Sequence, residues 1–278
     1  MPTTPSKSSA GETVPYLSRI RINPLRSGAQ PLLRNPHRMK VEVLGGVPAR
    51  TSDEPVLWRL DTFDPHQPHL LVLTHTKPSW DHIVERAGWP GADGEHALVR
   101  DYEPLLARLA IGREFAFRVT ANPVQSTAAP EKLTEHQRKA LENAPEGGGD
   151  APLRRGFRVG HRTAHHQTQW LLRRVSKAGF EIPPARTAEA GAPGMPEQGT
   201  AAPDLRLASS RQLRFNKKHN DKGRTPPITL MTATFEGRLR VTDPELLRAA
   251  LLTGLGPAKR YGCGLLTLAP LNESGNRG

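Results

Sequence analysis

Residues 254–266 read GLGPAKRYGCGLL. The glycines let the backbone approach a ligand closely, and Lys259 and Arg260 place positive charge beside exposed N–H groups. The run is not a dinucleotide-binding fingerprint, because Lys259 stands at the third glycine position and a strand follows the run instead of preceding it. It is not a P-loop either, because no Gly-Lys-Ser or Gly-Lys-Thr follows. Taken alone, the run is either a ligand-binding loop or a helix-to-strand turn with incidental glycines.

Regular elements are expected on both sides of this run. Asp243-Pro244 predicts the start of a helix through Leu252, and residues 265–268 predict the strand that closes the domain. Upstream, the patterns predict a helix over 165–177 and two strands over 205–215 and 228–241, which form a long hairpin with the Lys-rich tip 216–227.

The first half of the chain shows the same plan. Asn35-Pro36 predicts a helix that runs toward Val43 and stops at Gly45-Gly46. The predicted order is a strand over 16–23, this helix, strands over 56–60 and 70–74, a helix over 102–109 and a strand over 113–121. This is the order of a ferredoxin-like unit. We therefore expect an α+β fold built from two tandem ferredoxin-like (βαββαβ) domains of the RRM-like kind.

Composition shifts divide the chain further. The predicted divisions are a disordered lead-in over 1–14, a first ferredoxin-like domain over 15–124, a linker or loop excursion over 125–152, a second domain over 153–271 with the basic hairpin and the glycine-rich loop, and a tail over 272–278. Residues 183–203 are rich in Ala, Pro and Gly, and we expect them to be mobile.

The charge of the chain is concentrated in two windows. The 278 residues carry 39 Lys and Arg against 27 Asp and Glu, a net charge of +12, and the pI is about 10.4. Residues 16–40 hold six cations and no acid, and residues 205–224 hold seven cations against Asp221, so each window contributes +6. Such clustering favours a polyanion, above all nucleic acid. An anionic membrane surface is the alternative, but neither window shows a long apolar stripe opposite its cations.

Other classes of protein are disfavoured by the composition. One cysteine excludes a disulfide framework and a cysteine-based zinc site. No apolar stretch is long enough for a transmembrane helix, and the first residues lack the apolar segment of a secretory signal. We therefore expect a soluble cytoplasmic protein with no membrane partner.

Several segments together resemble a known family. They are the run 254–266, Phe235-Glu236-Gly237-Arg238-Leu239, the closing residues 262–270, Tyr16-Leu17-Ser18-Arg19, Leu57-Trp58-Arg59-Leu60 and the segment 117–123. In this order, over about residues 15–271, the chain resembles the CasE-type repeat-processing endoribonucleases of CRISPR systems, which are subunits of the type I-E Cascade complex.

The resemblance implies a function. It implies a metal-independent endoribonuclease with no cofactor, which cleaves CRISPR precursor RNA within its hairpin repeats. A ribose 2′-OH attacks the neighbouring phosphate, displaces the 5′-oxygen and leaves a 2′,3′-cyclic phosphate. The enzyme then retains the mature RNA within Cascade. The implied partners are the repeat RNA hairpin and the other Cascade subunits, and we expect a monomer when the protein is alone.

The family places a catalytic histidine three residues after a tyrosine in its first helix. Here His37 stands where the tyrosine is usual, and Lys40 replaces the histidine. Residues three apart on a helix share a face, so both can address one phosphate. Histidine exchanges protons near neutral pH, and a lysine ammonium serves as an acid or a fixed counter-charge. His37 and Lys40 are the predicted catalytic pair, with Tyr16 and Ser18 as weaker candidates. The alternative is a catalytically impaired subunit that binds repeat RNA without efficient cleavage.

The predicted RNA-binding residues come from the basic windows, the start of the second domain's helix over 165–177 and the glycine-rich loop. They are Arg34, Arg38, Arg158, Arg162, Arg211, Arg214, Lys217, Lys218, Lys222, Gly256, Lys259 and Arg260. In the resembled family a basic hairpin of the second domain lies along the RNA stem, and long cations read the shape of A-form RNA through its phosphates. We expect no metal site at His161, His165 and His166, because no carboxylate or cysteine stands at ligand spacing. We expect the four tryptophans and Cys263 to be packing residues.

Overall fold

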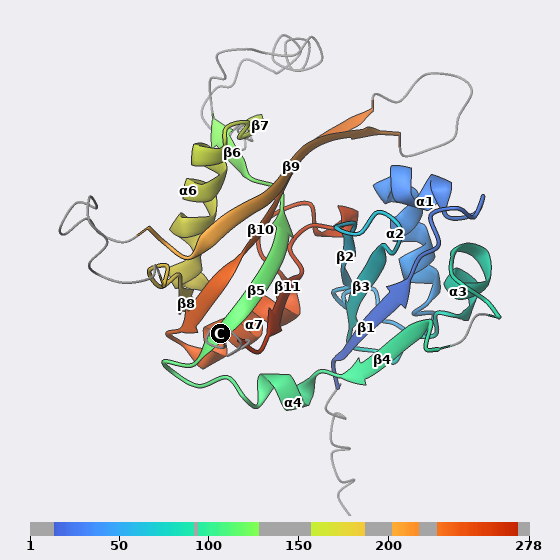
Figure 1. Cartoon of the computed structure of the whole chain (residues 1–278), viewed down its shortest axis with the longest axis horizontal. Coiled ribbons are helices and arrows are strands. Elements are labelled where there is room, and N and C mark those ends of the chain that lie inside the picture. The colour runs from blue at the N-terminus through green and yellow to red at the C-terminus, as the bar shows by residue number, and fades with distance from the viewer. Residues whose placement is uncertain (1–13, 92–93, 128–156, 187–201, 217–226, 272–278) are drawn as a thin grey trace, which may run out of the picture.

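The protein is described by a computed structural model, which covers residues 14–91, 94–127, 157–186, 202–216 and 227–271. Two antiparallel sheets lie side by side, each with its helices (Figure 1). Among the residues described, no helix is long and apolar enough to cross a membrane.

The first unit contains one sheet and the helices that cover one of its faces. Its elements are β1 (Tyr16–Arg21), α1 (Gln30–Arg34), α2 (Pro36–Gly45), β2 (Leu57–Asp61), β3 (His69–Thr74), α3 (Asp81–Ala87) and β4 (Ala97–Asp101). The strand order β2-β3-β1-β4 and the sequence order βαββαβ define a ferredoxin-like unit. Ile20 and Leu70 from the sheet pack with Met39 and Val43 of α2 and Ile83 of α3 in one buried cluster.

The helix α2 begins where the sequence predicts. The side chain of Asn35 accepts a hydrogen bond from the backbone N–H of His37 at 2.9 Å, and Pro36 occupies the first turn. The helix ends at Gly45, and Gly46 lies against Trp80, where an added Cβ would come within 2.2 Å of the indole ring. A side chain at residue 46 would therefore separate α2 from the segment that leads into α3.

The second unit repeats this plan with longer strands. Its elements are α4 (Glu103–Leu106), which leads into it, β5 (Glu114–Ala121), β6 (Val124–Thr127), β7 (Phe157–Gly160), α6 (Ala164–Val175), η1 (Ser176–Ala178), β8 (Phe180–Glu181), β9 (Leu205–Phe215), β10 (Ile228–Val241), α7 (Pro244–Thr253), η2 (Lys259–Tyr261) and β11 (Leu266–Ala269). The sheet has the order β11-β5-β10-β8, and β9 also pairs with β10. β6 and β7 form a separate hairpin. The core elements β5, α6, β9, β10, α7 and β11 give a second βαββαβ unit.

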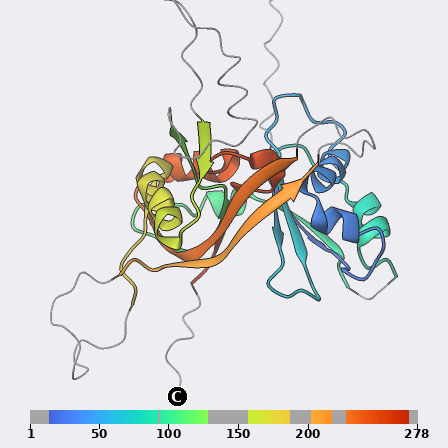
Figure 2. The same ribbon diagram turned by 90° about the horizontal axis from the view of Figure 1, so that it is seen from above.

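Most of the predicted elements are confirmed. The long hairpin β9–β10 has the predicted bounds, and Asp243 caps α7 by accepting from the backbone N–H groups of Glu245 and Leu246 at 3.0 Å. Figure 2 shows this hairpin arching from the second sheet toward α1 and α2. Its tip lies outside the described residues, as does most of the predicted linker 125–152, whose first residues form β6.

One assignment from the sequence is wrong. The strand predicted over 113–121 is present as β5, but it pairs with β10 and β11 and belongs to the second sheet. The first unit is closed by α3 and β4, which the patterns missed because β4 is a short, half-exposed edge strand and α3 starts without a side-chain cap. The helix predicted over 102–109 is reduced to Glu103–Leu106. The second sheet therefore begins at Glu114, before the expected boundary at residue 124.

The two units share a buried interface. In β3, Leu70 and Val72 face the first unit's helices, whereas Leu73 belongs to the core cluster of the second unit. Because both faces of β3 are buried, its sequence is a continuous apolar run. Arg59 of β2 is 2% exposed and donates to the backbone carbonyls of Arg118 at 2.8 Å and Leu265 at 3.0 Å. These bonds tie the first sheet to β5 and to the residue before β11.

Candidate functional site

His37 and Lys40 lie on the half-buried face of α2, which packs beside η2 of the other unit. Asn35, the N-cap of α2, also donates from its side-chain amide to the backbone carbonyl of Asn216 at 3.3 Å, so the start of α2 touches the β9–β10 hairpin. Lys40 lines a hollow of about 290 Å³ together with Arg50, Glu54, Trp58 and Arg260. We call this the α2 hollow. It brings a predicted catalytic residue and a predicted RNA-binding residue together from opposite units.

Glu54 is the one carboxylate among the described residues that line the α2 hollow. It accepts from the backbone N–H groups of His75 and Thr76, both at 2.8 Å, and from the Thr76 hydroxyl at 2.6 Å. Burial alone would raise the pKa of Glu54, but these hydrogen bonds together outweigh it and hold the pKa below its ordinary value. The carboxylate is therefore a fixed negative charge whose oxygens are already engaged.

The glycine-rich loop fills a narrow space between two tryptophans, one from each unit. Gly256 has a φ of +74° and an added Cβ would lie 2.7 Å from Trp170, whereas Gly262 has a φ of +81° and would place a Cβ 2.7 Å from Trp58. Ala258 also adopts a left-handed conformation, with a φ of 64°, directly before Lys259. The glycines are therefore required by packing and backbone conformation.

Four of the predicted RNA-binding residues meet in a second hollow. Arg162, Gly256, Lys259 and Arg260 line a depression of about 800 Å³ between β6 and β7, the β9–β10 hairpin and the loop that contains η2. Burial lowers the pKa of Lys259. Because these residues come from two elements far apart in the sequence, the fold gathers them into one cationic surface.

The remaining predicted residues are spread more widely. Arg211 and Arg34 line a cleft between the two units, the interdomain cleft. Arg38 is half-buried on α2. Arg214 is exposed and lies on the opposite face of β9 from Arg211, because successive strand residues alternate between faces. The backbone of Arg158 pairs with Ser126, and its side chain, like Lys217, Lys218 and Lys222, lies outside the described residues.

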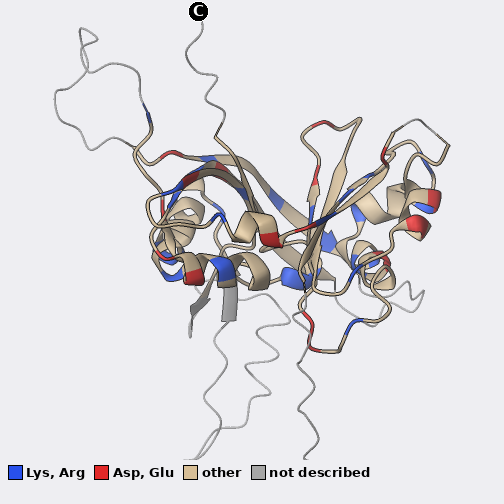
Figure 3. Ribbon diagram, turned by 90° about the horizontal axis from the view of Figure 1, so that it is seen from below, with Lys and Arg blue, Asp and Glu red and all other residues tan. Residues whose placement is uncertain are grey.

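Charged pairs on the second sheet are structural. Arg238 and Arg240 of β10 both bind Glu114 of β5, at 2.8 and 2.9 Å. Figure 3 shows such positive and negative segments side by side on neighbouring strands. Burial by itself lowers the pKa of Arg238. Hydrogen bonds to Glu114 and Asp204 and the charges of these two acids raise it by more, so the pKa lies above its ordinary value. These arginines, like Arg59, are compensated and are not available to a polyanion.

Two further groups of chemically suggestive residues are the histidines at the start of α6 and the single cysteine. The rings of His161 and His166 stack at 5.7 Å, and burial, followed by the charges of His166, Arg173 and Arg174, lowers the pKa of His161. Within the described part of the chain, no group of His, Cys, Asp or Glu is arranged to hold a metal. Cys263 is fully buried, which raises its pKa to about 12. The packing role expected for this cysteine is confirmed.

Sequence reasoning missed Glu54 and Tyr261. Tyr261 lines the second hollow and the interdomain cleft, and its ring contacts Phe215 of β9 edge-on at 5.1 Å. The signal for Tyr261 was its place beside Lys259 and Arg260 in the glycine-rich run. Glu54 carries no comparable signal, because its hydrogen-bond donors lie in the loop after β3.

Comparison with known proteins now gives the family. A family model described as "CRISPR associated protein" matches residues 15–270. The chain belongs to this family. Among curated relatives, the "CRISPR-associated endoribonuclease Cse3" of Thermus thermophilus is 27% identical over 92% of this chain and 100% of its own length. The "CRISPR system Cascade subunit CasE" of Escherichia coli is 50% identical over 42 residues, which are 15% of this chain and 21% of that protein.

The fold agrees with this assignment. The solved structure of Thermus thermophilus Cse3 bound to an RNA representing a pre-cleavage complex has a TM-score of 0.63 and is 26% identical, with 92% of this chain and 100% of that chain covered. The resemblance to CasE-type repeat-processing proteins, inferred from the segments quoted above, is thereby confirmed, as is the α+β fold with two ferredoxin-like units.

Proposed function

We propose that this protein is the CasE-type endoribonuclease that cleaves CRISPR precursor RNA within its hairpin repeats and retains the product as a Cascade subunit. The observation that carries the proposal is the α2 hollow, where Lys40 of the first unit and Arg260 of the glycine-rich loop line one cavity. Support comes from a relative named as a CRISPR-associated endoribonuclease that aligns over its full length.

The proposed chemistry needs no metal. The substrate's 2′-oxygen forms a bond to the adjacent phosphorus while the bond from phosphorus to the 5′-oxygen breaks, which leaves a 2′,3′-cyclic phosphate. His37 accepts the proton of the 2′-OH, and Lys40 donates a proton to the leaving 5′-oxygen. Arg260 and Arg50, which line the hollow with Lys40, stabilise the charge that develops on the phosphorane.

One observation favours the second candidate, a repeat-RNA-binding subunit that cleaves poorly. The α2 hollow is lined by the cations Lys40, Arg50 and Arg260, and its carboxylate, Glu54, is already bound by three donors. A hollow of this composition binds a phosphate well, but the proton acceptor assigned in α2, His37, is not among the residues that line it. Cleavage therefore depends on one residue that stands at the family's tyrosine position.

A cleavage assay in EDTA separates the two candidates. The enzyme gives a defined cut in cognate repeat RNA without divalent ions, and a 2′-deoxy substitution at the cut site abolishes it. We expect His37→Ala and Lys40→Ala each to lower the cleavage rate about 10²–10⁴-fold, the usual contribution of a general acid or base. Lys177→Ala, an exposed lysine on η1, is the matched control and keeps the rate.

Two results decide against parts of this proposal. RNA that is bound tightly but stays whole for hours identifies the binding subunit, and Lys40→His would then restore cleavage if the replaced histidine is the cause. Normal cleavage by both alanine variants contradicts the assignment of His37 and Lys40.

A further inference from the structure

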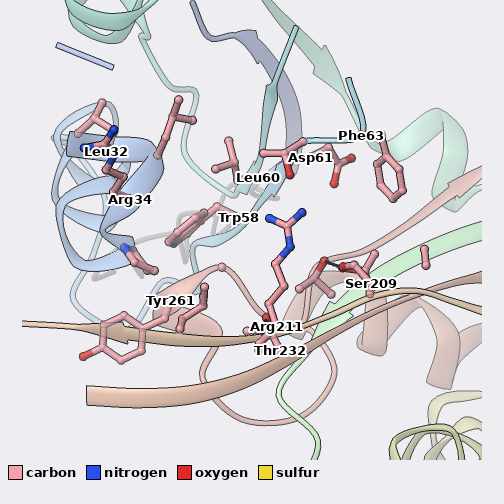
Figure 4. Close-up of a pocket in the computed structure, with 18 residues that line it drawn as sticks. Leu32, Arg34, Trp58, Leu60, Asp61, Phe63, Ser209, Arg211, Thr232 and Tyr261 are labelled. Carbon is pink, nitrogen blue, oxygen red and sulfur yellow. Dashed lines mark hydrogen bonds between the residues drawn. The ribbon is translucent and has the colours of Figure 1, made fainter. Parts of the chain in front are cut away.

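The two units leave a cleft between them on the side of the β9–β10 hairpin. It encloses about 310 Å³ and is lined by α1, the end of β2 and the following loop, strands β9 and β10, and η2. Figure 4 shows Trp58 and Leu60 on one wall and Arg211 extending from β9 toward Leu60 and Asp61. We call this the interdomain cleft.

The walls of the interdomain cleft combine apolar and polar surface in about equal measure. Leu32, Leu60 and Tyr261 supply apolar area. The hydroxyls of Thr120 and Thr234 bond to each other at 2.9 Å, so one of their two hydroxyl protons is already used. Phe63 at the rim is 51% exposed, and the guanidinium carbon of Arg118 lies 4.1 Å from its ring centroid. A small cavity with apolar patches on its walls and an exposed aromatic ring at its edge suits a planar ring such as a nucleobase.

The charge of the interdomain cleft is positive. Asp61 is bound by Arg59 and Arg118, and Glu236 is bound by Arg118 and Arg206, so these acids are already compensated. Arg211 and Arg34 are both exposed. Neither forms an ion pair with any of the described residues. Two uncompensated guanidinium groups, one from each unit, therefore line the same cleft, and each can pair with a phosphate of a bound strand.

The interdomain cleft adjoins the α2 hollow. Trp58 lines both cavities, and Pro36, which lines the cleft, directly precedes His37. Tyr261 of the cleft directly follows Arg260 of the hollow. A strand of RNA whose phosphate lies in the α2 hollow therefore reaches the cleft within a short distance along its backbone.

We propose that the interdomain cleft binds one unpaired nucleotide of the substrate RNA, next to the paired stem. The base stacks at Phe63 and the apolar part of the wall, and Arg211 and Arg34 pair with phosphates of the same strand. Base stacking on an aromatic ring tolerates every base, so this contact senses an unpaired strand and not a sequence. This inference rests on the proposed function, because it assigns a site to a part of the same substrate.

Two forms of the cognate repeat RNA test the proposal, both with a 2′-deoxy block at the cut site. One is the hairpin alone, and the other carries unpaired nucleotides on both sides. We expect the flanks to strengthen binding to the wild-type protein about tenfold, within the range for one stacked base. Phe63→Ala and Arg211→Ala each remove most of this gain. The fluorescence of 2-aminopurine, placed at each unpaired position in turn, is quenched at one position and recovers in Phe63→Ala.

Two controls isolate the cleft. Arg100→Ala, at an exposed arginine of β4 outside the cleft, keeps the full gain from the flanks. Arg214→Ala, on the opposite face of β9, weakens binding of both RNAs by the same factor. Thermal unfolding of each variant checks that its fold is intact.

The outcomes distinguish this inference from the proposed function. Equal wild-type affinities for the two RNAs overturn the inference while hairpin binding and cleavage still stand, and this is also the result if the cleft takes a segment of another protein. A flank gain that survives in both Phe63→Ala and Arg211→Ala overturns it as well. Failure of the wild-type protein to bind either RNA overturns both.

Discussion

Arg59 and Arg211 both lie between the two units, but their surroundings differ. Arg59 is 2% exposed and bonds to both carboxylate oxygens of Asp61, at 2.7 and 3.0 Å, and to two carbonyls of the other unit. Arg211 is exposed, and no acid in the described part of the chain pairs with it. Residue type alone therefore does not separate an arginine that joins two domains from one that is left for a ligand.

The difference lies in the neighbouring acids. A buried cation is tolerated only when carboxylates and carbonyls replace its lost hydration, as they do around Arg59. A cation without such partners stays at the surface and keeps its full attraction for phosphate. The interface around Arg59 holds the two units together, and the uncompensated cations gather in the cavities on either side of Trp58.

The largest expected effect comes from removing Arg59, the arginine whose charge is compensated by neighbouring groups. Arg59→Leu leaves two carbonyls and part of Asp61 without donors, so the free energy of unfolding falls by about 3–5 kcal/mol. Urea denaturation measures it, and Arg100→Leu at an exposed site stays within about 0.5 kcal/mol of wild type. A loss below about 1 kcal/mol for Arg59→Leu would show that the two units are held mainly by apolar contacts.

The next effect concerns the loop that joins the two cavities. Gly262→Ala places a Cβ 2.7 Å from Trp58 and forces a left-handed conformation on alanine. We expect a loss of about 2–4 kcal/mol in the free energy of unfolding, from strain and overpacking together. Gly91→Ala has the same sign of φ with nothing within 4 Å, so it isolates the conformational cost of about 1 kcal/mol. Equal losses in the two variants would contradict the packing argument.

A smaller effect follows from the fixed charge of Glu54. Because its pKa is lowered in the folded state, the stabilisation is present above the pKa of the unfolded chain and is lost as the pH falls through the folded value. Glu54→Gln therefore lowers the free energy of unfolding by about 1–2 kcal/mol at neutral pH and by less in acid. Denaturation at pH 7 and pH 3 measures this, with Glu95→Gln at an exposed carboxylate as the control. A difference that does not depend on pH would refute the assigned hydrogen bonds.

The smallest expected effect compares a free arginine with a paired one. Arg211→Ala lowers the slope of log affinity for repeat RNA against log salt concentration by roughly 0.7–0.9, because one phosphate contact is lost. Arg206→Ala changes the slope less, because Glu236 already engages that side chain. Titrations at several salt concentrations measure both slopes. Equal changes would mean that pairing with an acid does not decide which arginine binds RNA.

Local patterns predicted the elements whose signals lie in neighbouring residues. The cap at Asn35, the alternation through β5 and the two long strands of the β9–β10 hairpin each follow from a few adjacent side chains. Local patterns do not predict which strand pairs with which. β5 has the same alternation whichever sheet it joins, and its pairing with β10 and β11 depends on residues more than a hundred positions away.

The candidate site divides in the same way. The basic windows and the glycine-rich run are visible in the composition. The cations Lys40, Arg211 and Arg260, which line the two cavities, were therefore among those predicted. Compensation was not visible, because Arg59 and Arg118 meet Asp61 and Glu236 only after the sheets pack. Glu54 was missed for the same reason, whereas Tyr261 stands in the glycine-rich run and could have been included.

The sequence by itself determined the fold class, the excess of positive charge and the family, because each is visible in short-range patterns that do not depend on a partner. Tertiary structure alone decided which strand closes each sheet and which arginines remain uncompensated. The physical reason is that hydrogen-bond partners and counter-charges act over a few ångströms in space, and the residues that supply them are distant along the chain.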